Sequence, residues 1–227
     1  MRKKLILLVG AAGIIIAGAL FAKQKFFDYK YRVVTASQQA SELAKENEIK
    51  DGDIIFQTDL SEQSLAVQLA THSPYSHCGI IYRQGDTYIV FEAVQPVKKT
   101  PLDKWIARGK NGHFVIKRLK NAQQLLTAET LSRMKDIGES FMGRNYDGYF
   151  NWSDERIYCS ELVWKTYQRA AGIEVGKLEK LGDFDLSNKI VKKELKERYG
   201  DHIPFNEPVI SPADIFNSDL LVTVMTD

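Results

Sequence analysis

The sequence predicts an α+β protein in which a small antiparallel sheet packs on helices. Three observations support this prediction: two β-rich runs joined by a short loop, further strand-like runs on either side of them, and amphipathic helical segments before and after. Strands and helices that gather in separate runs are typical of this class. The chain has 227 residues, of which 44% are hydrophobic. This is enough for a single domain with a buried core.

The first part of the domain is predicted from its caps and turns. The expected elements are a helix over 36–49, a turn at Asp51-Gly52, a strand over 53–57 and a helix over 61–70. Ser61 is the expected N-cap of the second helix, because its hydroxyl can accept a hydrogen bond from the first helical turn. Ser73-Pro74 ends this helix, since proline cannot continue the helical hydrogen-bond pattern.

A β-hairpin is predicted in the middle of the chain. Its strands cover 76–82 and 87–94, and the four residues between them form a loop that contains Gly85. With this loop length, Tyr82 lies across from Thr87. This register also decides which polar side chains of the two strands can meet.

The second part of the chain alternates between helices and shorter strands. Glycines end several of the predicted helices, as is usual at helix C-termini. The expected elements are a short helix over 102–107, a strand over 112–119, a helix over 126–142, a polar and aromatic loop over 144–156, a helix over 160–171, a charged helix over 188–198 and a final strand over 220–225.

The amino terminus carries a targeting signal in front of this domain. Three basic residues precede an uncharged run over 5–22, which is the pattern of a signal peptide or of a signal anchor. The run is just long enough to span a bilayer as a helix. Residues 1–22 are therefore predicted to direct export to the cell envelope, with 23–227 as the single domain. Both cleavage in the periplasm and anchoring at the outer face of the cytoplasmic membrane remain open.

Charge excludes one class of partner. Without the three basic residues at the amino terminus, 28 basic residues stand against 29 acidic ones. The domain is nearly neutral, so we expect no nucleic-acid partner. Membrane association is expected only through residues 5–22, and we expect neither a cofactor nor a metal.

Cys159 is the strongest candidate for a catalytic residue. It stands where a short apolar segment becomes the amphipathic helix over 160–171. A thiol at this place feels the positive end of the helix dipole, which lowers its pKa and favours the nucleophilic thiolate. Backbone N–H groups at the same helix end can stabilise negative charge on a substrate oxygen.

His77 is the predicted base and Glu92 its orienting carboxylate. The hairpin register places them directly across from each other, where Cβ atoms are about 4.5–5.5 Å apart. An acidic residue inside an apolar strand is costly unless it is paired, which favours this interpretation of Glu92. The remaining histidines have no acidic residue across a predictable turn, and we expect them to be structural or exposed: His72, His113 and His202.

Cys78 leaves two alternatives open. It neighbours His77 and so points to the opposite face of the strand. A Cys78–Cys159 contact and a His77–Cys159 pair are therefore close to mutually exclusive. We expect Cys78 to be a buried free thiol. A disulfide between the two cysteines would instead indicate a non-catalytic envelope protein. A zinc site of His72, His77, Cys78 and Cys159 is a third possibility, without a familiar ligand spacing.

The chain resembles the YiiX/YebB-like group of permuted papain-fold cysteine hydrolases in the NlpC superfamily. The resemblance covers about residues 50 to 170, and its motifs occur in the order of the family. They are Gly52-Asp53-Ile54-Ile55-Phe56, Tyr75-Ser76-His77-Cys78-Gly79-Ile80, Phe91-Glu92-Ala93, the loop from Gly143 to Tyr149, and Tyr158-Cys159-Ser160-Glu161-Leu162-Val163, with Ser211-Pro212-Ala213-Asp214 in the tail.

The resemblance implies a circularly permuted papain-like fold in which histidine precedes cysteine. It assigns the nucleophile to Cys159, the base to His77 and the polar orienter to Glu92. Tyr146 and Tyr158, which lie in two of the matching motifs, are the expected substrate-binding residues.

The resemblance leaves the substrate open. Relatives act on cell-wall peptides or on lipid amides and esters, by hydrolysis or acyl transfer. The expected activity is therefore an exported thiol hydrolase that cleaves amide bonds of a cell-wall peptide, with a lipid-directed thiol esterase, amidase or acyltransferase as the alternative. The residues expected to serve a peptide are Arg144, Asn145, Asp147 and Asn151, and those expected to serve an acyl chain are Tyr149, Phe150 and Trp152.

Overall fold

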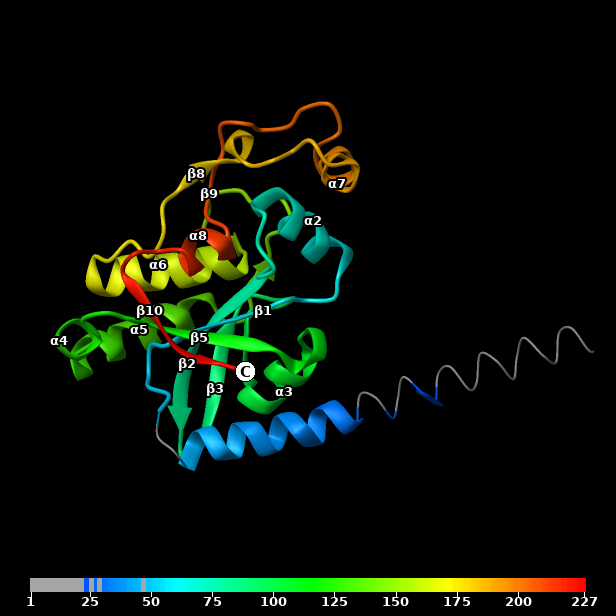
Figure 1. Cartoon of the computed structure of the whole chain (residues 1–227). Helices are drawn as coiled ribbons and strands as arrows, with labels where there is room; N and C mark the ends of the chain where they lie inside the picture. The colour runs from blue at the N-terminus through cyan, green and yellow to red at the C-terminus, as the bar shows by residue number, and fades with distance from the viewer. Residues whose placement is uncertain (1–22, 25–26, 28–29, 46–47) are drawn as a thin grey trace, which may run out of the picture.

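The structure is a computed structural model that describes residues 23–24, 27, 30–45 and 48–227 (Figure 1). The predicted targeting segment over 5–22 lies outside the described residues. In the described part of the chain, no helix is both long enough and apolar enough to span a membrane.

A six-stranded sheet forms the centre of the fold. Its strand order is β10-β5-β1-β2-β3-β4, and each neighbouring pair is antiparallel. The strands are β1 (Ile54–Gln57), β2 (His77–Gln84), β3 (Thr87–Glu92), β4 (Lys98–Pro101), β5 (Phe114–Leu119) and β10 (Leu221–Thr226). Two short pairs lie outside this sheet: β6 (Asn145–Tyr146) with β7 (Arg156–Ile157), and β8 (Glu179–Lys180) with β9 (Pro208–Val209).

Helices surround the sheet. A helix covers the described residues 30–45 near the amino terminus. The others are α2 (Glu62–Thr71), α3 (Leu102–Arg108), α4 (Ala122–Leu125), α5 (Ala128–Phe141), α6 (Cys159–Ala171), α7 (Lys189–Tyr199) and α8 (Pro212–Phe216), with single 3₁₀ turns at Lys110–Gly112 and Leu181–Asp183.

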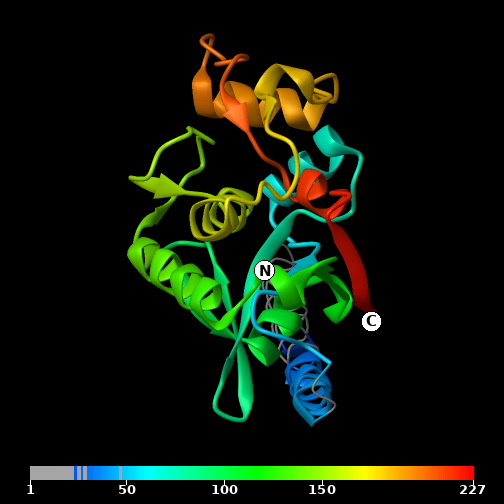
Figure 2. The ribbon, with the colours of Figure 1, turned by 90° about the vertical axis from the view of Figure 1, so that its left-hand side faces the viewer.

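The two faces of the sheet belong to different cores, as the alternation of side chains along a strand requires. In β2, Cys78, Ile80 and Tyr82 face a core shared with α6, whereas Ile81 faces a core shared with α3 and the helix over 30–45. Figure 2 shows α5 and α6 on one side of the strands and the amino-terminal helix on the other. The first core also extends to α7, so it reaches the end of the molecule farthest from the amino-terminal helix (Figure 1).

The α+β prediction with a small antiparallel sheet on helices is confirmed, and most elements lie where the sequence predicts them. Ser61 is the N-cap of α2, and its side chain accepts from the backbone N–H of Ser64. The helix expected over 36–49 starts earlier, since helix covers 30–45, and residues 48–50 are not helical. The helix expected over 126–142 is α5, which begins at Ala128 because the Thr127 side chain caps it by accepting from Thr130 N–H, and the short helix α4 before it was not predicted.

The predicted hairpin loop is two residues too long. The structure pairs Gln84 with Thr87, so the turn consists of Gly85 and Asp86 alone. Gly85 has a φ of +61°, which suits the first central position of a tight II′ hairpin turn and is unfavourable for other residues. The register therefore shifts by two positions. Because side chains alternate with a period of two, each strand keeps the predicted face.

Candidate active site

Cys159 is the first residue of α6, and its side chain is buried. Tyr158 is the N-cap, and the side chain of Glu161 accepts a hydrogen bond from its backbone N–H at 3.4 Å. α6 packs against β2 and α5. This packing holds the amino end of α6, with its unpaired N–H groups, next to the first residues of β2.

His77 and Glu92 meet across the hairpin. The Nε2 atom of His77 donates to Oε2 of Glu92 over 2.6 Å, and both side chains are buried. Ile80 and Phe91 are the last paired residues, so the next step of the register places Glu92 across from Gly79 and diagonal to His77. Position 79 has no room for a larger residue, because a Cβ there would lie only 2.5 Å from the Val90 side chain and 2.6 Å from the carbonyl of Phe91. Diagonal neighbours are still within reach of long side chains, so the contact survives the corrected register.

Each oxygen of the Glu92 carboxylate has further partners. Thr100 donates to Oε1 at 2.5 Å, and Arg108 donates to Oε1 at 3.0 Å and also to Oε2. Burial would raise the pKa of Glu92, but the hydrogen bonds and charges of His77 and Arg108 outweigh it and hold this pKa well below its usual range. Glu92 is therefore a carboxylate over the whole physiological pH range.

The His77 ring lies against Trp105 of α3, with ring centroids 5.9 Å apart and an interplanar angle of 27°. Burial lowers the pKa of His77, but the charge and hydrogen bond of Cys159 and those of Glu92 raise it to about 10. The ring is thus an imidazolium at neutral pH. Since Nε2 serves Glu92, Nδ1 is the nitrogen left for the sulfur of Cys159.

The sulfur of Cys159 is the other half of this ion pair. The Cys78 thiol donates to it, and this hydrogen bond together with the charge of His77 lowers the pKa of Cys159 well below its usual value, against the effect of burial. Burial, together with the hydrogen bond to Cys159, raises the pKa of Cys78. The arrangement is a thiolate–imidazolium pair with a neutral thiol beside the thiolate.

The expectation that Cys78 and His77 exclude each other as neighbours of Cys159 is wrong. α6 packs on the sheet face to which Cys78 points, and Cys78 and Cys159 share that core. Cys159 also lies at the end of β2, where His77, the first residue of the strand, is within reach. Both cysteines are free and buried, so the disulfide expected for a non-catalytic envelope protein is not formed.

Three polar residues around His77 are not among those predicted from the sequence. Arg108 and Thr100 come from α3 and β4, and no periodicity links them to Glu92. Gln57 pairs with His77 between β1 and β2, is fully buried, and its side-chain amide has no hydrogen-bond partner in the described structure. Gly109 makes room for this amide, since a Cβ there would collide with it.

Tyr146 and Tyr158, the predicted substrate-binding residues, both line a pocket next to Cys159. The hydroxyl of Tyr146 accepts from Gln63 at 2.8 Å, and the hydroxyl of Tyr158 accepts from the backbone N–H of Ile210 at 3.2 Å. Both hydroxyl groups are therefore held by the protein itself. Their rings are left as walls of the pocket.

The other histidines lie outside the site. His72 is exposed and pairs with Asp185 at 3.1 Å, and His113 contacts the backbone carbonyl of Asp227. Within residues 30–45 and 48–227 no three histidine, cysteine or acidic side chains are grouped so that they could hold a metal ion. The zinc ligand set considered above, which needs His72 beside Cys159, is therefore not assembled.

The chain is similar to known proteins in sequence and in fold. Residues 48–225 match the family described as permuted papain-like amidase enzyme, YaeF/YiiX, C92 family. The chain is 48% identical over 173 residues to the uncharacterized protein YiiX of Escherichia coli strain K12, covering 76% of this chain and 84% of that one.

A solved structure resembles the fold as well. The crystal structure described as metalloprotein YiiX from Escherichia coli O157:H7 superposes with a TM-score of 0.76 at 47% sequence identity, covering 79% of this chain and 98% of that chain. The circularly permuted papain-like fold expected from the sequence motifs is thereby confirmed.

Proposed function

The chain belongs to the YaeF/YiiX family of permuted papain-like amidases, and on this premise we propose that it is a thiol hydrolase of the cell envelope that cleaves amide bonds through Cys159, His77 and Glu92. One observation supports the proposal most: a buried cysteine at a helix N-terminus, its pKa lowered, beside an imidazolium that a buried carboxylate holds. Nucleophilic thiols are activated in this way.

In the first step the Cys159 thiolate attacks the amide carbonyl carbon. The negative charge that develops on the carbonyl oxygen is stabilised by backbone N–H groups in the first turn of α6, which have no helical carbonyl to bond. The C–N bond then breaks, and the Nδ1 proton of His77 goes to the leaving amine. The product of this half-reaction is a thioester on Cys159.

Water completes the cycle. His77, now neutral, takes a proton from a water molecule whose oxygen attacks the thioester carbonyl. The C–S bond breaks, the carboxylic acid leaves, and the thiolate–imidazolium pair is restored. Glu92 keeps Nε2 protonated throughout, so that Nδ1 stays directed at the reacting atoms, and Arg108 and Thr100 keep Glu92 in place.

Cell-wall peptides are the proposed amide substrates that the sequence motifs favour. Two of the four polar residues expected to hold such a peptide use their side chains in hydrogen bonds within the protein. Asp147 is buried and accepts from the backbone N–H groups of Tyr149 and Asn151 at 2.8 Å, and Asn145 accepts from Gln95 at 2.6 Å. The largely apolar lining of the pocket next to Cys159 favours the second candidate, an amidase for an apolar acyl group.

Export is part of the proposal. The basic residues and the uncharged run over 5–22 support it, because they have the form of a signal peptide or an anchor. N-terminal sequencing of protein recovered from the membrane and periplasmic fractions separates cleavage from anchoring. Recovery in the cytoplasm with an intact amino terminus would contradict export.

The catalytic proposal is tested with the full chain and the variants Cys159→Ala, Cys159→Ser and Cys78→Ser. Muropeptides and N-acyl amides are incubated with each protein, and release of free amine is measured. The Cys159 variants should lose both hydrolysis and rapid alkylation by iodoacetamide, whereas Cys78→Ser, which keeps a donor beside the Cys159 sulfur, should retain both. Undiminished hydrolysis by Cys159→Ala would overturn the proposal.

A further inference from the structure

Cys78 is a buried thiol that forms no bond in the proposed reaction, although it touches the nucleophile. The sulfur of Cys159 accepts hydrogen bonds from both the thiol and the backbone N–H of Cys78. Both cysteines are free, so two oxidisable groups lie in contact within one site. A serine at position 78 could supply the same side-chain hydrogen bond, whereas only a thiol can form a covalent bond with the sulfur of Cys159.

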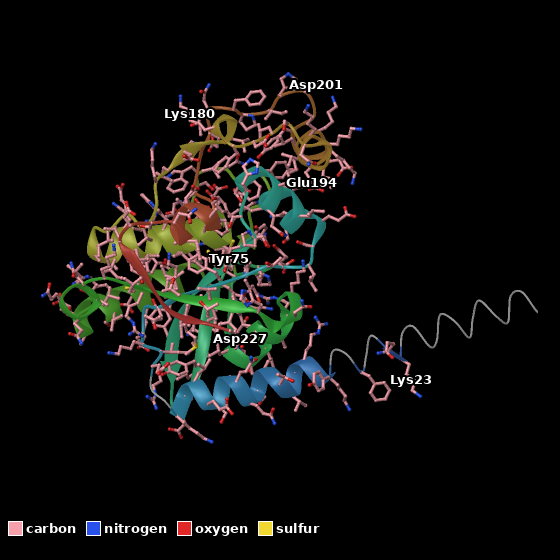
Figure 3. All side chains as sticks on the ribbon, viewed as in Figure 1. Lys23, Tyr75, Lys180, Glu194, Asp201 and Asp227 are labelled. Atoms are coloured by element: carbon pink, nitrogen blue, oxygen red, sulfur yellow. The ribbon has the colours of Figure 1, made fainter. Side chains whose placement is uncertain are left out.

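The packing around Cys78 closes it off from solvent. Cys78 pairs with Phe56 of β1, whose ring packs edge-on against Tyr75 and Phe216, with centroid distances of 6.2 Å and 5.2 Å. Figure 3 labels Tyr75 in the middle of the molecule. α6 covers the same face of the sheet, and Cys78 has no exposed surface. Since the chain has two cysteines, Cys159 is the one sulfur with which Cys78 can pair.

Cys159, by contrast, can be reached by a small oxidant. Only 4% of its surface is exposed, but it lines a pocket with about 710 Å³ of space not filled by atoms, part of it open to solvent. The hydrogen bonds from Cys78 and the charge of His77 lower its pKa, so the group at the wall of this pocket is a thiolate. Thiolates are the form of cysteine that peroxides oxidise.

We propose that Cys159 and Cys78 form a reversible oxidation site, in which hydrogen peroxide converts Cys159 to a sulfenic acid and Cys78 then closes a disulfide with it. In the first step the Cys159 sulfur attacks a peroxide oxygen. The O–O bond breaks, and the leaving hydroxide takes the proton of the His77 imidazolium to become water.

In the second step the Cys78 sulfur attacks the Cys159 sulfur. The S–O bond breaks, and the hydroxyl group leaves with the Cys78 proton as a second molecule of water. The two sulfurs together lose two electrons, and one molecule of peroxide is reduced to two of water.

The arrangement of the two sulfurs favours the second step. The Cys159 sulfur already contacts the thiol and the main chain of Cys78, so a bond of about 2.05 Å needs only a small movement of the start of α6 against β2. The charge of the Cys159 thiolate is one cause of the raised pKa of Cys78. This cause disappears when the thiolate becomes a neutral sulfenic acid, so Cys78 then ionises more easily.

The disulfide would switch the site off and also protect it. A sulfur held in a disulfide cannot attack a carbonyl carbon, and reduction by a dithiol restores the thiolate. A sulfenic acid without a neighbouring thiol is oxidised further to a sulfinic acid, which dithiols do not reduce. Export, as proposed above, would place the site in an oxidising compartment.

The oxidation site is tested by treating the full chain with hydrogen peroxide. The wild type should lose both titratable thiols and the mass of two hydrogen atoms, and it should give no adduct with dimedone, which traps sulfenic acids. Peptide mapping should show Cys78 and Cys159 joined within one chain. Dithiothreitol should restore the original rate of alkylation by iodoacetamide.

Cys78→Ser and Cys78→Val are the test variants, each compared with its own alkylation rate before treatment. Peroxide should convert their Cys159 to a sulfenic acid that dimedone traps, and then to a sulfinic acid. The fraction of the alkylation rate that dithiothreitol restores should be about tenfold lower than in the wild type. The melting temperature before treatment shows whether each variant is folded.

The control is Cys159→Ala, whose single thiol is the buried Cys78. In the folded protein this thiol should resist both peroxide and iodoacetamide. Rapid oxidation of Cys78 in this variant would contradict the proposal, because Cys78 would then react without Cys159. Oxidation of the wild type straight to a sulfinic acid, as fast as in Cys78→Ser and without a disulfide, would overturn it.

These measurements need no substrate, so they are separate from the test of the proposed function. A disulfide that forms in a protein that hydrolyses no amide would overturn the hydrolase and leave the oxidation site supported. Hydrolysis by a protein that forms no disulfide would have the opposite meaning.

Discussion

His77 and Glu92 lie diagonally across the β2–β3 hairpin, and their side chains are joined by a 2.6 Å hydrogen bond. If this bond orients the imidazole, Glu92→Gln should lower kcat/KM about 10²–10⁴-fold, because the ring loses its orientation and the stabilisation of its charge. Without the carboxylate, the pKa of His77 falls from about 10, so the alkaline limb of the pH–rate profile should move to lower pH.

The controls for this variant are Glu92→Asp and the melting temperature. Glu92→Asp keeps the charge and should recover part of the activity. A Glu92→Gln variant that is folded, fully active and unchanged in its pH profile would show that Glu92 has only a structural role.

Arg108 is expected to be a positioning residue that acts through Glu92. Its guanidinium contacts both carboxylate oxygens and lies 3.4 Å from Nε2 of His77. Arg108→Gln should lower kcat about 10- to 100-fold, the usual effect of losing a hydrogen bond to a charged group, with little change in KM. Arg108→Lys should recover part of this loss. Lys104→Gln, an exposed change on the same helix, serves as the control and should have no effect.

Cys78 is expected to tune the nucleophile through its S–H donor. Cys78→Val removes the donor, so the pKa of Cys159 should rise. Alkylation by iodoacetamide should then become fast only at a higher pH than in the parent. Cys78→Ser keeps a donor and should shift the profile much less. The measurement is the alkylation rate as a function of pH, with Cys159→Ala as the blank. Superposable profiles for the parent and Cys78→Val would rule out this role.

Glu161 should make the stability of the protein depend on pH. Burial raises its pKa from 4.5 to about 7, although Lys165 lies 2.7 Å away. The folded state then holds more protons than the unfolded state between pH 4.5 and 7. The contribution of Glu161 to the free energy of unfolding is therefore complete below pH 4.5 and declines by about 3 kcal/mol as pH rises to 7.

The variant Glu161→Gln isolates this effect. The free energy of unfolding of the wild type, minus that of the variant, should decrease as pH rises through this window in urea titrations. In the variant, Lys165 keeps its hydrogen bonds to the Asp154 carboxylate and the Ser153 carbonyl. The contribution of Lys165 to the free energy of unfolding therefore stays nearly constant. A difference that does not change with pH would show that Glu161 is ionised normally.

Local patterns were sufficient to predict the hairpin pair. The face on which His77 and Glu92 lie depends only on whether the register shift is even or odd. The two-residue error in the loop therefore changed their relation from opposite to diagonal and kept them on one face. The place of Cys159 at the start of α6 likewise follows from the local change from an apolar segment to an amphipathic helix.

The remaining features of the site depend on packing between distant segments. Arg108 reaches Glu92 because α3 covers the sheet, Cys78 reaches Cys159 because α6 packs on the face to which Cys78 points, and the pocket exists because α7 lies over α2. No periodicity or motif encodes these distances. They result from the burial of apolar faces on elements that are far apart in the sequence.

The sequence by itself thus determined the groups of the candidate site: a cysteine at a helix N-terminus, with a histidine and a carboxylate on one face of a hairpin. Only the tertiary structure decided what surrounds these groups, namely the charges that set their pKa values and the apolar walls beside the thiol. The reason is physical, because helix caps and strand alternation are short-range properties of the chain. Desolvation and cavity shape arise only when separate elements pack together.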